Sequence, residues 1–364
     1  MEVIHSNLTN SVSLEEAQET GHQALVSSLA SARFYISSAS IFVALFGMGC
    51  VISIKDFSDR DTHLSKSVVI GLTFQSLFQP VIGYGLALLL DMSASEAVAM
   101  IMLACSPVSP LCAVLVYYGD GVVIVGMCMA MFSTALSVGL IPLWFSFYAS
   151  NWTHEYFVIP TPLDLALAEL LLVVPTILGV LYQKKYGKVK GRLMAKICSN
   201  AFWIAAVITP VLNGITNPEY YMVDWQIWVG TVSLPPIGFV CGIVIALIAS
   251  LPFNVCCAVS LAVGMPNVYF ASQLSERYLS ENEETLKDVR GILTIFSLVT
   301  PLEGFIWAIM YRYIEGMFLK ISHKCCRCSD DDPDHGQDNR RLLMDAEEPE
   351  ARLSKPSRVS FLDC

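Results

Sequence analysis

Charged side chains are scarce in this chain. Only 15% of its 364 residues are charged, whereas 54% are hydrophobic. A soluble domain needs more polar surface, so the composition indicates an integral membrane protein with lipid as its solvent. The net charge of −10 comes from acidic residues in the N-terminal segment, one late loop and the C-terminal tail, and we expect no nucleic-acid partner.

Histidine is missing from every long apolar segment, although the chain has six histidines. An intramembrane hydrolase would need paired catalytic residues there, so we expect no enzyme. Twelve cysteines lie mostly inside apolar runs without a pair of Cys-x-x-Cys motifs. This favours buried hydrophobic cysteines over disulfides or a zinc site, and we expect no metal site and no cofactor.

Nine apolar segments are long enough to cross a bilayer, which predicts an all-α, multi-pass membrane protein. They cover residues 34–54, 67–90, 96–118, 122–148, 163–183, 197–216, 226–250, 253–279 and 292–318. Residues 1–33 lack the basic start and short apolar core of a cleavable signal peptide. We therefore expect the first span to direct insertion.

Lysine and arginine gather in alternate connections, above all in "KKYGKVKGRLMAK" at 184–196. Basic connections face the cytoplasm, which predicts an extracellular segment 1–33 and a cytoplasmic tail. Asn7 and Asn151 each begin an N-x-Thr sequon, and both fall outside, so they are candidate glycosylation sites.

The tail, residues 319–364, is acidic and poor in apolar residues after Ser329, and we expect it to be disordered. Its sequence "DNRRLL" has the form of an acidic dileucine signal that a sorting adaptor would bind through Asp338, Leu342 and Leu343. We expect the plasma membrane as the location, with an endosomal or lysosomal membrane as the alternative.

Prolines recur at a fixed offset between the two halves. Pro107 and Pro266 are 159 residues apart (266 − 107), and so are Pro142 and Pro301 (301 − 142). This offset predicts an inverted repeat of the kind that transporters use, with chance as the alternative because 17 prolines form many pairs.

Two of the spans contain helix-breaking sequences, "CSPVSP" at 105–110 and "GMP" at 264–266. Interrupted backbone survives at membrane depth only where protein or a wet cavity covers it, so we predict two discontinuous helices that cross near the midplane and expose backbone groups to a solute or ion. The candidate residues of the transport path are Gln75, Gln79, Ser106, Pro107, Ser109, Gly264, Pro266 and Asn267. Gln75 and Gln79 lie one turn apart, and hydrogen bonding between helices is their alternative role.

These broken segments resemble motifs of the bile acid:sodium symporter family. The stretch from Cys105 to Thr134, "CSPVSPLCA" followed by "GD" and "ST", is similar to the family's first crossover pattern, Cys-Ser-Pro-Gly-Gly-Asn-x-Ser-Asn. The stretch "VSLAVGMPNV" at 259–268 is similar to the second pattern, Val-Ser-Met-Glu-x-Gly-x-Gln-Asn-Val. "TFQSLFQP" at 73–80 and "PLEGF" at 301–305 match its second and ninth spans.

The resemblance implies two bodies within residues 34–318. A core of spans 67–148 and 226–318 would move against a panel of spans 34–54 and 163–216. An organic anion of the bile acid or steroid-conjugate class would bind between them and cross by alternating access. The alternative is a non-transporting receptor or trafficking scaffold that keeps the fold in the lipid bilayer.

The resemblance also implies where sodium ligands would lie, and this chain departs from the family there. The positions hold Cys112, Ala113, Gly126, Ala130, Ala262 and Pro266, and only Gln75 keeps its residue type. Hard cations need oxygen ligands, so sodium remains a possible co-substrate, but we expect its coupling to be weakened or lost.

Glu303 is the most deeply placed carboxylate, midway along the ninth segment. A charge at this depth costs roughly 2.5–3.5 kcal/mol on insertion scales, so such a residue usually faces a cavity. Glu303 is a candidate for ion coupling by a proton, with a structural role near the core as the favoured alternative.

Overall fold

The computed structural model describes residues 28, 35–57, 63–152, 162–278 and 283–329. Every regular element within these ranges is a helix, and the remaining pairing is one isolated bridge between Val108 and Pro266. The predicted all-α class is therefore confirmed for this part of the chain.

Three long helices follow the predicted apolar segments closely, and a fourth extends beyond its predicted segment, 292–318, at both ends. After a first helix, Tyr35–Gly49, and the short 3-10 helix η1 (Ile54–Phe57), the chain forms α2 (Leu64–Leu89), α5 (Val123–Ala149), α7 (Trp225–Ile248) and α10 (Glu283–Ser329). Pro80, Pro142, Pro235, Pro236 and Pro301 lie inside these helices.

Helix α6 (Pro162–Thr216) consists of two helices joined at Gly187. Gly187 has φ 86° and ψ 167°, a conformation that glycine adopts without the steric penalty of a Cβ. The segment 184–196 between the predicted spans is thus helical on both sides of one glycine, because its Lys, Arg, Leu, Met and Ala residues favour helix.

Two further segments are interrupted where the sequence predicts. The first changes from α3 (Ala94–Cys105) to α4 (Leu111–Tyr118), and the second from α8 (Phe253–Val263) to α9 (Val268–Tyr278). The order long helix, broken helix, long helix therefore occurs twice along the chain. Both breaks lie at the centre of the molecule, since residues 101–109 and 255–267 are all buried.

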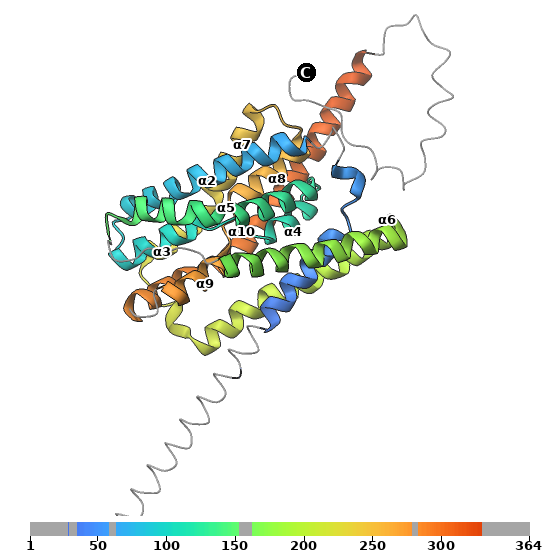
Figure 1. The fold of residues 1–364 in the computed structure, drawn as a ribbon. Coiled ribbons are helices and arrows are strands. Elements are labelled where there is room, and N and C mark those ends of the chain that lie inside the picture. Colours follow the sequence, from blue (N-terminus) through green and yellow to red (C-terminus); the bar gives the residue numbers. More distant parts are fainter. Residues whose placement is uncertain (1–27, 29–34, 58–62, 153–161, 279–282, 330–364) are drawn as a thin grey trace, which may run out of the picture.

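The first helix packs against the α6 hairpin, which lies on the opposite side of the molecule from α2 and α7 (Figure 1). A Cβ added to Gly179 would lie 2.2 Å from the carbonyl oxygen of Phe46, and one added to Gly49 would lie 2.3 Å from that of Thr176. These helices approach backbone to backbone, as small residues permit in membrane proteins.

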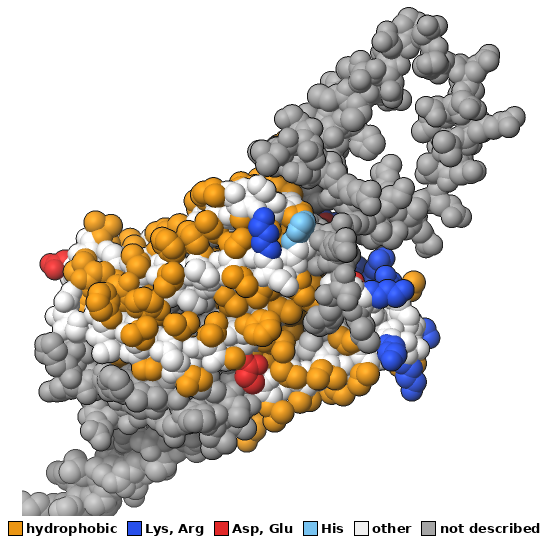
Figure 2. Space-filling view, turned by 45° about the horizontal axis from the view of Figure 1, so that its top comes forward, with side chains coloured by type: hydrophobic (Ala, Val, Ile, Leu, Met, Phe, Trp, Pro, Cys, Tyr) orange, Lys and Arg blue, Asp and Glu red, His pale blue; other side chains and the backbone are white. Residues whose placement is uncertain are grey.

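The outer surface agrees with insertion in a bilayer. Figure 2 shows hydrophobic side chains over the described flank of the molecule, with Lys and Arg side chains gathered at one end. Among the described residues, five helices are long and apolar enough to cross a membrane, and three shorter helices are also apolar. The chain is an integral membrane protein with several spans.

The contact at Gly179 gives a test of the packing between the first helix and α6. We expect Gly179→Ala to lower the melting temperature of the detergent-solubilised protein, because overpacking costs about 1–3 kcal/mol. Gly139→Ala is the matched control, since nothing lies within 4 Å of a Cβ at Gly139. Equal melting temperatures for the two variants would contradict this packing.

Candidate functional site

The two breaks cross as a short antiparallel pair. Ser109 N donates to the carbonyl oxygen of Met265 at 2.8 Å, and Asn267 N donates to that of Pro107 at 2.7 Å. Val108 and Pro266 face each other between these bonds. They form a non-hydrogen-bonded pair of an antiparallel ladder, in which the two facing residues do not bond to each other. The missing N–H of Pro266 therefore removes no hydrogen bond from the pairing.

The crossing also closes the N-termini of the second half-helices. Ser109 Oγ accepts from Leu111 N at 3.3 Å where α4 begins. Asn267 Oδ1 accepts from Tyr269 N at 3.1 Å and from Phe270 N at 3.2 Å where α9 begins. Asn267 is thus the N-cap of α9, and in this conformation these backbone groups pair within the protein rather than with a solute.

Neighbouring long helices hold the first break in place. Gln75 Nε2 on α2 donates to the carbonyl oxygen of Ser106 at 3.0 Å, at the end of α3 where carbonyls lack helical partners. Ser133 Oγ on α5 accepts from Val108 N at 2.9 Å. The sequence patterns single out Gln75 near the break, but they give no signal that Ser133 bonds Val108.

The positions expected to carry sodium ligands are packed with side chains that lack oxygen. Cys112, Ala113, Ala130 and Ala262 are fully buried, and the Cys112 thiol donates to the carbonyl oxygen of Gly126 at 3.6 Å. A Cβ added to Gly126 would lie 3.5 Å from that sulfur. The thiol therefore packs between α4 and α5.

Several buried polar side-chain atoms in the described part of the chain have no hydrogen-bond partner, and two of these side chains, Gln79 and Glu303, are candidate residues from the sequence. Gln79 is fully buried, neither of its amide atoms is hydrogen-bonded, and a Cβ on Gly238 would lie 3.1 Å from its Oε1. Glu303 is half-buried, and its Oε2 is buried without a hydrogen bond. Unpaired buried polar groups are costly, which makes both positions candidates for function.

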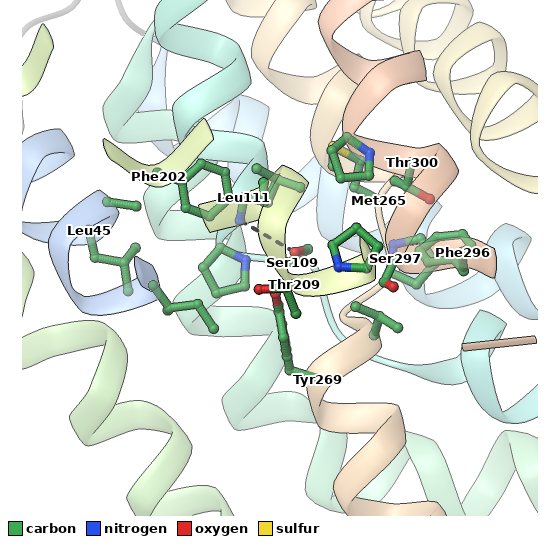
Figure 3. Close-up of a pocket in the computed structure, with 18 residues that line it drawn as sticks. Leu45, Ser109, Leu111, Phe202, Thr209, Met265, Tyr269, Phe296, Ser297 and Thr300 are labelled. Carbon is green, nitrogen blue, oxygen red and sulfur yellow. Dashed lines mark hydrogen bonds between the residues drawn. The ribbon is translucent and has the colours of Figure 1, made fainter. Parts of the chain in front are cut away.

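An inner cavity of about 50 Å³ lies beside the crossing, bounded by the first helix, α6, α9 and α10. Figure 3 shows Ser109, Thr209, Ser297 and Thr300 among the mostly apolar side chains that line it. Ser109 and Pro266 are the expected path residues found in this lining.

The other expected path residues lie elsewhere. Gln75 and Pro107 line a separate small hollow, whereas the buried residues Gln79, Ser106, Gly264 and Asn267 line neither cavity. Sequence motifs missed Phe202 and Thr209, because α6 has no pattern that marks which face turns toward the crossing.

Asn151 lies exposed in the turn after α5, where its Nδ2 donates to the hydroxyl of Tyr84 at 2.6 Å. The second candidate glycosylation site, Asn7, lies outside the described residues. So do Asp338, Leu342 and Leu343 of the candidate sorting signal.

Comparison with known proteins identifies the family. Residues 39–220 match the model of the Sodium Bile acid symporter family. The chain belongs to this family. It is 27% identical over 258 residues to the ileal sodium/bile acid cotransporter of Homo sapiens. The aligned region covers 70% of this chain and 72% of the relative.

A second relative is named for organic anions rather than bile acids. The chain is 21% identical over 279 residues to the sodium-dependent organic anion transporter of Bos taurus. The aligned region covers 76% of this chain and 72% of the relative. The predicted family resemblance is therefore confirmed, and the family consists of membrane transporters rather than enzymes.

The cap on α9 gives a test at the crossing. We expect Asn267→Ala to destabilise the protein by about 1 kcal/mol, because it removes the acceptor for two backbone N–H groups. Asn267→Ser retains a capping oxygen and is expected to melt close to the wild type in a thermal unfolding assay. A serine variant that melts as early as the alanine variant would contradict the assignment of Asn267 as a cap.

Proposed function

We propose that this protein carries organic anions of the bile acid or steroid-conjugate class across a membrane by alternating access, with its coupling to sodium weakened or lost. The observation that carries this proposal is the crossing itself. The two breaks are held by reciprocal backbone bonds, while the side chains at the expected cation positions Cys112, Ala113 and Ala262 offer no oxygen.

We assign the nine spans to two bodies. The first helix and the α6 hairpin would form the panel, which their close contact at Gly49 and Gly179 supports. The twice-repeated order of long, broken and long helices would form an inverted-repeat core. With the basic tip of α6 in the cytoplasm, the N-terminus is outside and Asn151 lies exposed on the outer side, as a glycan acceptor in the plasma membrane requires.

The small size of the inner cavity supports the proposal of alternating access. Ligand sites for small molecules have volumes of about 300–1,000 Å³, whereas this cavity has about 50 Å³. Panel and core must therefore separate before a steroid conjugate can enter. One bond to be broken joins α6 to α10, where Asn213 Nδ2 donates to Thr294 Oγ1 at 2.8 Å.

Residual ion coupling would depend on Gln75 or Glu303. The amide of Gln75 already bonds Ser106, so its capacity for a cation is reduced. Glu303 keeps a buried carboxylate oxygen without a partner among the described residues, which would suit a proton. A structural role for Glu303 remains the alternative.

Uptake by transfected cells tests the proposed function. We expect labelled taurocholate or a steroid sulfate to enter at a similar rate when external sodium is replaced by choline, because the sodium ligands are missing. Strictly sodium-dependent uptake would overturn the account of the cation positions. Absence of any uptake, with normal surface expression, would favour the non-transporting receptor or scaffold.

Restoring the family's ligand types tests the account in the opposite direction. We expect Ala262→Glu combined with Cys112→Ser, Ala113→Asn and Pro266→Gln to make uptake depend on sodium, because oxygen ligands and a carboxylate return. The matched control replaces Ala262 with Gln in the same background, which lacks the charge. Surface biotinylation checks that both variants reach the membrane, and equal sodium responses would contradict the account.

A further inference from the structure

A second cavity lies next to the inner one and is much larger, with a volume of about 430 Å³. We call it the outer vestibule. The two cavities share lining residues from α6, α9 and α10, so they lie directly next to each other on the side of the crossing. The shared residues are Thr209, Pro210, Val268, Tyr269 and Ser297.

The two cavities differ in the polarity of their linings. The inner cavity is lined mainly by hydrocarbon side chains such as Leu45, Phe202 and Phe296. The vestibule is lined largely by hydroxyl and amide side chains, and its described lining contains no carboxylate. These polar residues are Ser37, Thr209, Asn213, Asn217, Tyr220, Tyr269, Ser272, Thr294 and Ser297.

Arg290 is the one ionised side chain among the described residues that line the vestibule. It lies half-buried on α10, and its Nη1 donates to the hydroxyl of Tyr220 at 3.4 Å. A guanidinium has five N–H donors, so it can keep bonds within the protein, such as the one to Tyr220, and bind the oxygens of an anion at the same time. Bonds from a guanidinium to a carboxylate or sulfate are charge-assisted and strong.

The vestibule lies at the end of the molecule where α6 ends and α10 begins, as its lining from Asn213, Asn217 and Arg290 requires. The basic tip of α6 around Gly187 lies one helix length away, at the opposite end. By the positive-inside rule, the vestibule therefore opens to the exterior.

We propose that the outer vestibule is an anion-binding subsite in which Arg290 determines specificity. An amphipathic anion would enter with its apolar body toward the crossing and its carboxylate or sulfate beside Arg290 and Tyr220. This inference rests on the proposed transport function for its ligand, but the electrostatic selectivity of the vestibule can be measured without transport.

Cysteine accessibility provides that measurement. We expect Ser272→Cys, half-buried in the vestibule lining, to react in intact cells with membrane-impermeant thiosulfonates. An anionic reagent should react roughly fivefold faster than a cationic one of similar size, because a unit charge nearby attracts it. The described native cysteines are buried or half-buried, and the wild type gives the background rate.

Two added substitutions distinguish the effect of Arg290 on the reagent preference from that of another positive charge on the same helix. We expect Arg290→Gln to abolish the preference for the anionic reagent in the Ser272→Cys background. Lys287→Gln, an exposed residue on the same helix outside the described lining, should leave the preference unchanged. A preference that survives Arg290→Gln, or that Lys287→Gln removes equally, would overturn the inference.

Uptake assays separate this inference from the proposed function. We expect Arg290→Gln to reduce uptake of a steroid sulfate about tenfold, as loss of a charge-assisted bond allows, and to leave uptake of the parent neutral steroid unchanged. An Arg290-dependent reagent preference without uptake by the wild type would support the subsite and refute transport. Uptake of the sulfate by the wild type that is unaffected by Arg290→Gln would refute the subsite alone.

Discussion

Every backbone polar group that leaves a helix inside a bilayer must find a partner within the protein, and the rest of this structure depends on that constraint at the two breaks. The breaks satisfy it by pairing with each other. The bonds from Ser109 N and Asn267 N join the two halves of the chain, while Gln75 and Ser133 bond the Ser106 carbonyl and Val108 N of the first break. Because these partners come from α2 and α5, the long helices must pack around the crossing in fixed positions.

The same crossing explains why the cation positions can lose their oxygen atoms without loss of the fold. Backbone bonds between the two breaks hold the broken helices together. Alanine at positions 113, 130 and 262 and the thiol of Cys112 fill the neighbouring space with small buried groups. Hydrocarbon packing is the less costly way to fill a site in the interior when no charge has to be held there. The proposed loss of sodium coupling is therefore compatible with the fold.

Much of the fold could be predicted from the sequence because hydrophobic segments and prolines carry strong local signals. The breaks at "CSPVSP" and "GMP" are found where those residues predict them. The cap formed by Asn267 and the bond from Gln75 to Ser106 require knowledge of which groups meet across the fold, and a single sequence does not contain that. The vestibule was missed for the same reason, since Asn213, Ser272 and Arg290 come from three helices that are distant along the chain. Arg290 lies in a run of charged residues that also suits an ordinary solvent-exposed loop.

The antiparallel pair of Val108 and Pro266 has a consequence for how the protein folds during its synthesis. Each half of the chain supplies one donor and one acceptor to the pair, so neither half is self-sufficient in lipid. During synthesis the first break stays without its backbone partners until more than a hundred and fifty further residues have been added. Until then, neighbouring helices or the insertion machinery must shield its polar groups from lipid. A truncated chain that ends before the second break would leave Ser109 N and the Pro107 carbonyl without hydrogen-bond partners in the membrane. Such a chain is expected to misfold and to be degraded.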